Sequence, residues 1–267
     1  MAGNTKTLRI RIKSVTSTLQ LTKAMGLVAS SKIRRANEVM VKGRNYLESL
    51  DRTIELLTSD RESLKSPFMQ KYNTGKTRII IIAGDRGLAG GYNANVFRLA
   101  AKYKDAEFLP IGKRACERYG TSIVSSEYFS FSDAAQMADS LCSEFSVGKY
   151  DRLGIISTKY LSAMSQESQI KWILPLERSE GSANCDIVFE PDHLTVLNNV
   201  AREYVAGIIT AAVRESFASE VAARRMAMDS AGKNAKEMIS NLQLQYNRAR
   251  QGAITQEITE IVAGSGN

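Results

Sequence analysis

Proline and histidine are scarce in this sequence of 267 residues. Its four prolines all lie outside residues 1–66 and 192–267, so each of these stretches can form a long helix without an internal break. His193 is the only histidine, and a Ser-His-Asp triad or a multi-histidine metal site would therefore have to include it. Its place at the start of the last stretch predicts a solvated residue, and no catalytic constellation is evident.

Cysteines and long apolar runs are also few. Cys116, Cys142 and Cys185 are odd in number, far apart and without a CxxC pair, which excludes a disulfide framework and a zinc site and favours a reducing compartment. No run of about 18 apolar residues is present, so we expect no membrane-spanning helix. The N-terminus has no apolar signal core, and its apolar pattern continues unbroken into the chain, which we interpret as mature structure.

Acidic residues are missing from the start of the chain, where the first one is Glu38. The formal net charge is +8, and this favours an acidic partner such as nucleic acid, anionic lipid or an acidic protein without choosing among them. The eight basic residues that precede Glu38 are Lys6, Arg9, Arg11, Lys13, Lys23, Lys32, Arg34 and Arg35.

An uncharged seam runs through the first proline-free stretch. From Ile12 to Leu57, the positions reached by alternating steps of three and four residues are all uncharged. This spacing is the heptad pattern of a coiled coil. Gly26 and Ala29 make the middle of the seam small, so the partner helix must come close there. The seam positions are Ile12, Val15, Leu19, Thr22, Gly26, Ala29, Ile33, Ala36, Met40, Gly43, Leu47, Leu50, Ile54 and Leu57.

The second proline-free stretch is the expected partner. It begins after Pro191-Asp192 and runs to about Ala263, where Gly264 would end it. If the two helices pair antiparallel, residue n of the first faces roughly residue 257 − n of the second. The last dozen residues, from about Thr255, then have no partner within the chain although they carry several apolar side chains. An exposed apolar helix end predicts a socket in another protein.

The middle of the chain alternates between strand and helix patterns. Strands are expected at 78–84, 107–112, 121–129, 152–158 and 170–175, and helices at 94–104, 113–119 and 132–147. The predicted fold is a long antiparallel coiled coil of the N- and C-terminal helices plus a small central α/β domain with a mainly parallel sheet. We divide the chain into an N-terminal coiled-coil helix (1–66), the central α/β domain (67–191) and a C-terminal coiled-coil helix (192–267).

Two glycine-containing motifs fall short of a nucleotide site. GDRGLAGGYN (84–93) follows the first strand, where phosphate loops lie in dinucleotide folds. Its glycine spacing is not GxGxxG and Asp85 would repel a phosphate, so we favour a tight structural turn. NTGKT (73–77) lacks the first glycine of a Walker loop, because that position is Gln70. We expect no cofactor and no metal.

Five segments together resemble the γ subunits of F-type ATP synthases. The resemblance covers essentially the whole chain. It implies a central rotor shaft without catalysis of its own, which couples proton-driven rotation of the c ring to ATP synthesis and hydrolysis at β-subunit sites. The segments are TKAMGLVASSK (22–32), DRGLAGGYNANVF (85–97), EPD (190–192), SEVAARRMAMDSAGKNA (219–235) and YNRARQGAITQEITEIVAG (246–264).

The resemblance also implies partners and a location. The partners are the α and β subunits of the α3β3 ring, the ε subunit or its equivalent, and the c ring, through which alone the chain would meet the membrane. The implied location is peripheral to an energy-transducing membrane. Because no presequence is evident, we expect the cytoplasmic face of a bacterial cell membrane, with an organellar inner membrane as the alternative. The alternative function is that of a basic coiled-coil protein that binds nucleic acid. One observation argues against it: the aromatic residues are not interleaved with the basic ones.

Contact residues follow from the matching motifs. Glu190, in EPD, would meet the polar loops of the c ring, although no tyrosine precedes this motif. Ala89 stands where many relatives have cysteine, and the middle domain lacks a dithiol insertion. The residues that would face the α3β3 ring are Lys23, Met25, Arg224, Gln251, Thr255 and Glu257.

Overall fold

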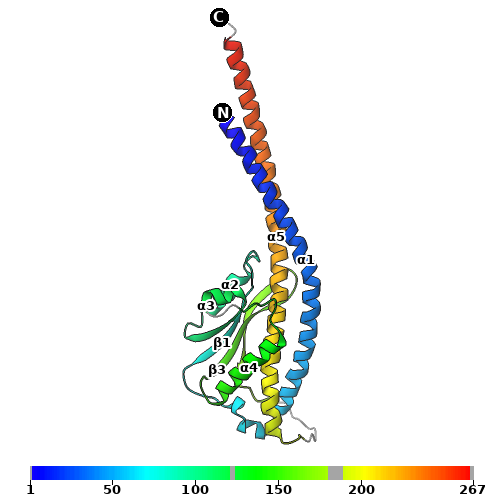
Figure 1. Cartoon of the computed structure of the whole chain (residues 1–267), viewed down its shortest axis with the longest axis vertical. Helices are drawn as coiled ribbons and strands as arrows, with labels where there is room; N and C mark the ends of the chain where they lie inside the picture. The colour runs from blue at the N-terminus through cyan, green and yellow to red at the C-terminus, as the bar shows by residue number, and fades with distance from the viewer. Residues whose placement is uncertain (1, 121–123, 180–188, 265–267) are drawn as a thin grey trace. The chain divides into compact units, whose positions relative to one another are not determined.

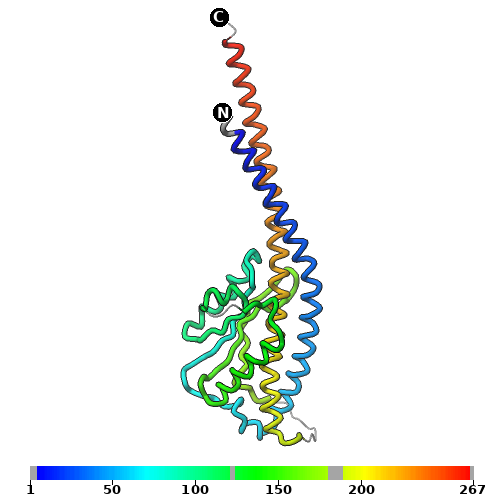
Figure 2. Tube along the Cα trace, in the orientation of Figure 1, coloured from blue at the N-terminus to red at the C-terminus, as the bar shows by residue number. Residues whose placement is uncertain are grey.

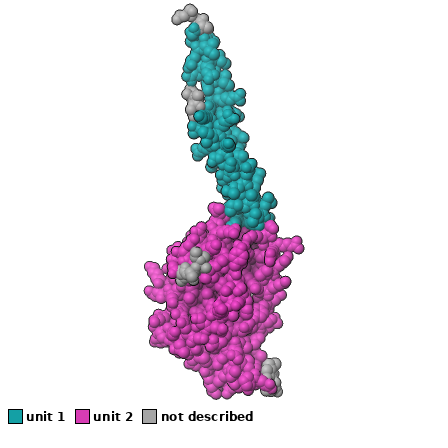
Figure 3. Space-filling view, viewed as in Figure 1, with its two compact units in different colours: residues 1–30, 224–267 teal, residues 31–223 magenta. Residues whose placement is uncertain are grey.

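The computed structural model describes residues 2–120, 124–179 and 189–264. The chain divides into two compact units, residues 1–30 with 224–267 and residues 31–223, which Figure 3 colours separately. The elements in chain order are helix α1 (Ala2–Ser59), the short 3-10 helices η1 (Arg61–Lys65) and η2 (Pro67–Met69), strand β1 (Thr77–Ile82), helix α2 (Tyr92–Ala100), strand β2 (Ala106–Ile111), helices α3 (Lys113–Tyr119) and α4 (Phe131–Ser146), strands β3 (Arg152–Tyr160) and β4 (Gln166–Leu174), and helix α5 (His193–Gly264).

The two long helices confirm the expected coiled-coil elements. α1 has 58 residues and α5 has 72, and each contributes residues to both units. All fourteen seam positions of α1 are buried or half-buried, because an uncharged heptad stripe is stable only when it packs against another helix. The expected helix start after Pro191-Asp192 is also confirmed, and α5 is helical up to Gly264, the last residue that the structure describes.

Contacts within each unit show that the helices run antiparallel. In the first unit, a Cβ built on Gly26 would lie 3.6 Å from the Met228 Cβ, and one on Gly232 would lie 3.7 Å from the Thr22 hydroxyl oxygen. In the second unit, a Cβ on Gly43 would lie 3.7 Å from Arg214. Rising numbers on α1 therefore match falling numbers on α5, close to the predicted register.

A four-stranded sheet in the order β2-β1-β3-β4 forms the centre of the second unit (Figure 1). β1 pairs in parallel with β2 and with β3, while β4 pairs antiparallel with β3 at the edge. This confirms a mainly parallel sheet. Both faces are covered, which explains why β1 is a continuous apolar run and does not alternate.

The odd and even residues of β1 face different helices. Ile80 and Ile82 belong to the larger apolar core with α4 and α5, while Ile79 and Ile81 belong to a second core with α2 and α3. All four side chains are fully buried, and each contributes roughly 1.5–3 kcal/mol through the removal of apolar surface from water. The sheet is therefore fixed to α5 on one face and to the small helices on the other.

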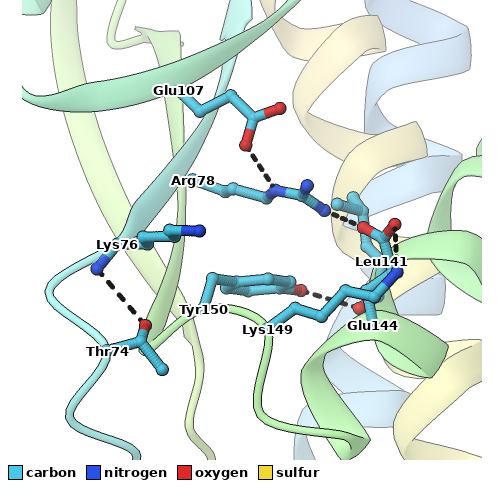
Figure 4. A network of polar contacts seen from close by, with 8 residues as sticks. All are labelled: Thr74, Lys76, Arg78, Glu107, Leu141, Glu144, Lys149 and Tyr150. Atoms are coloured by element: carbon cyan, nitrogen blue, oxygen red, sulfur yellow. Dashed lines mark hydrogen bonds and ion pairs between the residues drawn. The ribbon is translucent and has the colours of Figure 1, made fainter.

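Arg78 anchors the start of β1 through charged neighbours (Figure 4). Its guanidinium forms ion pairs with Glu107 on β2, at 2.8 Å, and with Glu144 on α4. It also lies over the Tyr150 ring, 5.0 Å from the centroid, and the Tyr150 hydroxyl donates to the Leu141 carbonyl at 2.7 Å. Burial raises the pKa of Tyr150 well above its ordinary value. The group joins β1, β2 and α4 in one polar cluster.

The structure differs from the sequence-based expectations at residues 124–129 and at His193, and it buries two of the cysteines. The predicted strand at 121–129 is wrong for residues 124–129, which form no strand, and residues 121–123 lie outside the described residues. His193 is buried against the Phe189 ring, at 5.1 Å between centroids, and is not solvated as we expected. Cys116 and Cys142 are buried free thiols, and burial raises the pKa of Cys142 to about 12; Cys185 lies outside the described residues.

Candidate partner-binding surfaces

A groove of about 470 Å³ lies beside the small residues of the first unit. It follows the line where α1 and α5 meet, and Gly26 and Gly232 form part of its floor because they have no side chain to fill it. The lining residues are Leu19, Thr22, Lys23, Gly26, Leu27, Ser30, Arg225, Met228, Asp229, Gly232, Lys233 and Lys236. The predicted thin middle of the coiled coil is thus a shallow groove.

The groove is predominantly positive. Lys23, Arg225 and Lys236 line it, and the single acid, Asp229, pairs with Lys233 at 2.8 Å. The hydrogen bond from Lys233 holds the pKa of Asp229 below its ordinary value, and the same bond raises the pKa of Lys233. Such exposed charges form and break contacts at a cost of about 0–1 kcal/mol, so the groove can make only weak contacts with acidic groups.

The end of α5 carries an apolar surface. Every residue of the segment 254–264, which we call the tip, is exposed, and Figure 2 shows α5 continuing beyond the N-terminal end of α1. Ile258 is 56% exposed and Ile261 is 69% exposed. Large apolar side chains grouped on one short helical segment indicate a surface that another protein covers.

The sequence-predicted ring contacts lie on this unit. Lys23 is exposed in the groove, Met25 and Arg224 are half-buried, and Gln251 and Glu257 are exposed near the tip. The Thr255 side chain is also exposed, but its hydroxyl donates to the Gln251 carbonyl at 3.0 Å within the same helix. The structure thus divides the predicted contacts between the groove region and the tip.

Exposed apolar residues on α1 were missed by the sequence argument. Leu21, Leu27 and Val28 do not belong to the buried seam, and they are 59%, 72% and 57% exposed. The sequence does carry a signal for them: they are apolar residues outside the heptad seam, where side chains are usually polar. They add exposed apolar side chains to this unit away from the tip, and Leu27 lines the groove.

Glu190 lies in the second unit, just before α5. Its side chain is exposed. Two residues later, Asp192 accepts hydrogen bonds from the Thr195 amide at 2.9 Å and the Thr195 hydroxyl at 2.7 Å, and thus caps the first turn of α5. The preceding residues of CDIVFEPD, Cys185 to Val188, lie outside the described residues, so the predicted c-ring contact is represented here by Glu190 alone.

The turn at 84–93 is built around the Asp85 carboxylate. Asp85 accepts hydrogen bonds from the backbone amides of Lys113, Ser126 and Glu127, at 3.0, 3.0 and 3.1 Å, and from the Ser125 hydroxyl. The Glu220 carboxylate lies so close to Gly84 that an added Cβ would be 2.7 Å from its carbon atom. Two acidic groups therefore occupy the place where a phosphate would need donors, which supports a structural turn.

Replacing Asp85 with alanine should destabilise the second unit. Burial alone would raise the pKa of Asp85, but the four hydrogen bonds outweigh it and lower the pKa below its ordinary value. The stabilisation is therefore present at neutral pH and is lost as the pH falls through the lowered pKa. We expect Asp85→Ala to cost roughly 2–4 kcal/mol at pH 7, measured by chemical unfolding, with a smaller difference from wild type in strong acid. A difference independent of pH would contradict this account.

No group of three or more His, Cys, Asp or Glu side chains among the described residues could hold a metal ion. Within the same residues, no helix has the length and apolar character needed to cross a membrane.

Comparison with known proteins identifies similar chains. The model of the ATP synthase family matches residues 4–266. An ATP synthase gamma chain from Ruminococcus albus is 40% identical, and a sodium-ion-specific ATP synthase gamma chain from Acetobacterium woodii is 36% identical; in each case the match covers 99% of both chains. Solved structures share the fold: a chain of Euglena gracilis mitochondrial ATP synthase has a TM-score of 0.69 at 20% identity, covering 99% of this chain and 94% of that one. A central stalk/c-ring chain from Tetrahymena thermophila has a TM-score of 0.63 at 24% identity, covering 79% of this chain and 99% of that one.

Proposed function

Because the chain belongs to the ATP synthase γ-chain family, we propose that it is the central rotor shaft of an F-type ATP synthase. In this proposal the paired helices turn inside a ring of α and β subunits, and the chain couples proton-driven rotation of the c ring to ATP synthesis or hydrolysis at β-subunit sites. It has no catalytic site of its own. The chain would act in three parts, with the helices of 1–66 and 192–267 as the shaft and 67–191 as the foot.

The exposed tip is the observation that carries the proposal. A helix end on which Ile254, Ile258 and Ile261 are all exposed gains stability only when another protein covers it. The groove region adds weak, mainly positive contacts, and a strong buried ion pair would instead trap one orientation at a cost of roughly 3–5 kcal/mol. A helix whose apolar tip is enclosed by the ring of α and β subunits, and whose charged contacts with that ring are weak, can rotate within it.

The predicted contact residues follow from this arrangement. We assign Met25 to the β-subunit loop that follows rotation and Lys23 to the α3β3 ring. Glu190 is assigned to the c ring. The residues assigned to the β-subunit catch loops are Arg224, Gln251, Thr255 and Glu257. An ε-type subunit would bind the foot. We place the complex at the cytoplasmic face of a bacterial cell membrane, which the chain would meet only through the c ring. The shaft can shift a catalytic site from one conformational state to another only if its interaction free energy differs between those states.

Reconstitution tests the proposal directly. The purified chain is mixed with the α and β subunits of its own source, and the assembly is analysed by native mass measurement and ATP hydrolysis. We expect a stable complex with one copy of this chain and hydrolysis that requires it. Failure of the three proteins to assemble would overturn the proposal.

The nucleic-acid alternative receives no support from the comparisons. Its test is DNA binding by the isolated chain at moderate salt. Weak binding that disappears as salt rises is expected of any protein with a net charge of +8. Tight binding that persists would favour the alternative over the rotor shaft.

A further inference from the structure

The far end of strand β3 lacks a neighbouring strand on one side. β1 pairs with β3 only as far as Ile156, whereas β4 on the other side follows β3 to Tyr160. Residues 158 and 160 of β3 therefore need other partners for the backbone groups that point away from β4, because buried backbone groups are almost always hydrogen-bonded.

Side chains of α5 and α1 supply these partners. The Thr158 amide donates to the Ser216 hydroxyl at 3.1 Å, and the Ser219 hydroxyl donates to the Thr158 carbonyl at 3.3 Å. The Tyr160 amide donates to the Glu215 carboxylate at 3.1 Å, and Arg44 on α1 donates to the Tyr160 carbonyl at 3.2 Å. Arg44 also pairs with Glu215. We call this set of four hydrogen bonds and one ion pair the β3 seam.

The β3 seam is largely shielded from water. Thr158, Ser216 and Ser219 are 2%, 1% and 0% exposed, and the Tyr92 hydroxyl donates to the Ser216 carbonyl from α2 at 3.0 Å. Apolar packing also holds α5 on the sheet, but the hydrophobic effect has no preferred direction and does not fix position along the contact. Hydrogen bonds weaken steeply with distance and angle, so the seam resists rotation and sliding of the helices against the sheet.

We propose that the β3 seam is the torque-bearing connection between the helix pair and the sheet of this chain, with Arg44, Glu215, Ser216 and Ser219 as positioning residues. The inference rests on the proposed function, since only a rotating shaft must pass torque between its helices and its foot. Helix α1 contributes only Arg44 to the β3 seam. Through this residue the β3 seam connects both long helices to the end of β3.

The test compares variants in the complete, vesicle-reconstituted ATP synthase. Ser216→Ala with Ser219→Ala removes both hydroxyl partners of Thr158, and Glu215→Gln removes the charge that faces Arg44 but leaves an acceptor for the Tyr160 amide. Ser49→Ala is the matched control, since the Ser49 hydroxyl bonds only to the Asn45 carbonyl of its own helix. If the double serine variant does not fold, Ser219→Ala alone takes its place.

Two measurements separate a torque role from a merely structural one. Hydrogen exchange of the Thr158 amide should quicken about two- to tenfold for the lost hydrogen bond. At equal rates of ATP hydrolysis, ATP-driven proton transport should fall in the seam variants and not in Ser49→Ala. Faster exchange with an unchanged ratio of transport to hydrolysis would overturn the inference. Failure of the wild-type chain to assemble would instead refute the proposed function, so the two failures are distinct.

Discussion

Gly112→Ala should be among the most destabilising single substitutions in this chain. Gly112 follows β2 with a φ of 95°, where residues with a side chain are rare. A Cβ added there would lie 1.9 Å from the Ala83 carbonyl oxygen, which is backbone and cannot rotate away. The change must push apart the ends of β1 and β2, where the Ala83 amide donates to the Ile111 carbonyl at 2.9 Å. We expect a loss of roughly 4 kcal/mol or more in the free energy of unfolding.

A second glycine isolates the cause of that loss. Gly75 also has a positive φ, of 76°, but a Cβ on it would meet nothing within 4 Å. Gly75→Ala should therefore cost only the backbone strain, about 1–2 kcal/mol. Chemical unfolding of both variants measures the difference. Equal losses in the two variants would show that the contact with Ala83 does not decide the outcome.

The long helices could be predicted because the heptad spacing and the lack of proline are both visible within one continuous stretch of sequence. Fourteen uncharged positions at heptad spacing leave few alternatives, and the first helix indeed buries or half-buries every one of them. The same argument located the groove indirectly, because Gly26 is a small residue in a seam of larger ones. The tip also followed from the sequence, since the second proline-free stretch is longer than the first.

The errors arose where contacts in the folded chain differ from what a local pattern suggests. Residues 121–129 contain β-branched residues typical of a strand, but the Ser126 and Glu127 amides bind the Asp85 carboxylate and do not pair with a neighbouring strand. His193 was expected in water because helix starts are usually exposed, yet Phe189 covers it. The first outcome depends on a partner 41 and 42 positions away in the sequence, which no local pattern indicates. The second depends on the nearby Phe189, whose ring position a sequence pattern does not give.

The β3 seam could not be predicted for a related reason. Glu215, Ser216 and Ser219 are polar residues of a helix, and polar helical residues usually face water. They instead face the sheet because β1 ends before β3 does, and the relative length of two strands is a property of the folded sheet. The sequence therefore gives no sign that these three residues connect the helix to the strand.

Gly26→Leu should weaken assembly with the α and β subunits while changing the isolated chain much less. The alanine variant is the matched comparison: its Cβ would lie in ordinary contact, 3.6 Å from the Met228 Cβ, and alanine is favoured over glycine in a helix by about 1 kcal/mol. A leucine carries three further carbons, which must either displace Met228 or occupy the adjoining groove. Either result thickens the helix pair where the seam is smallest.

The expected size of the effect follows from overpacking. Forcing extra methylene groups into a fitted contact costs about 1–3 kcal/mol, so Gly26→Leu should weaken binding to the ring by roughly tenfold, with reduced coupling of ATP hydrolysis to proton transport in the complex that still forms. Titration of the ring with each variant, followed by hydrolysis and transport assays, measures both quantities. Wild-type assembly and coupling in the leucine variant would refute the idea that the small seam residues set the width of the shaft. The added side-chain volume would then have made no contact with the ring of α and β subunits.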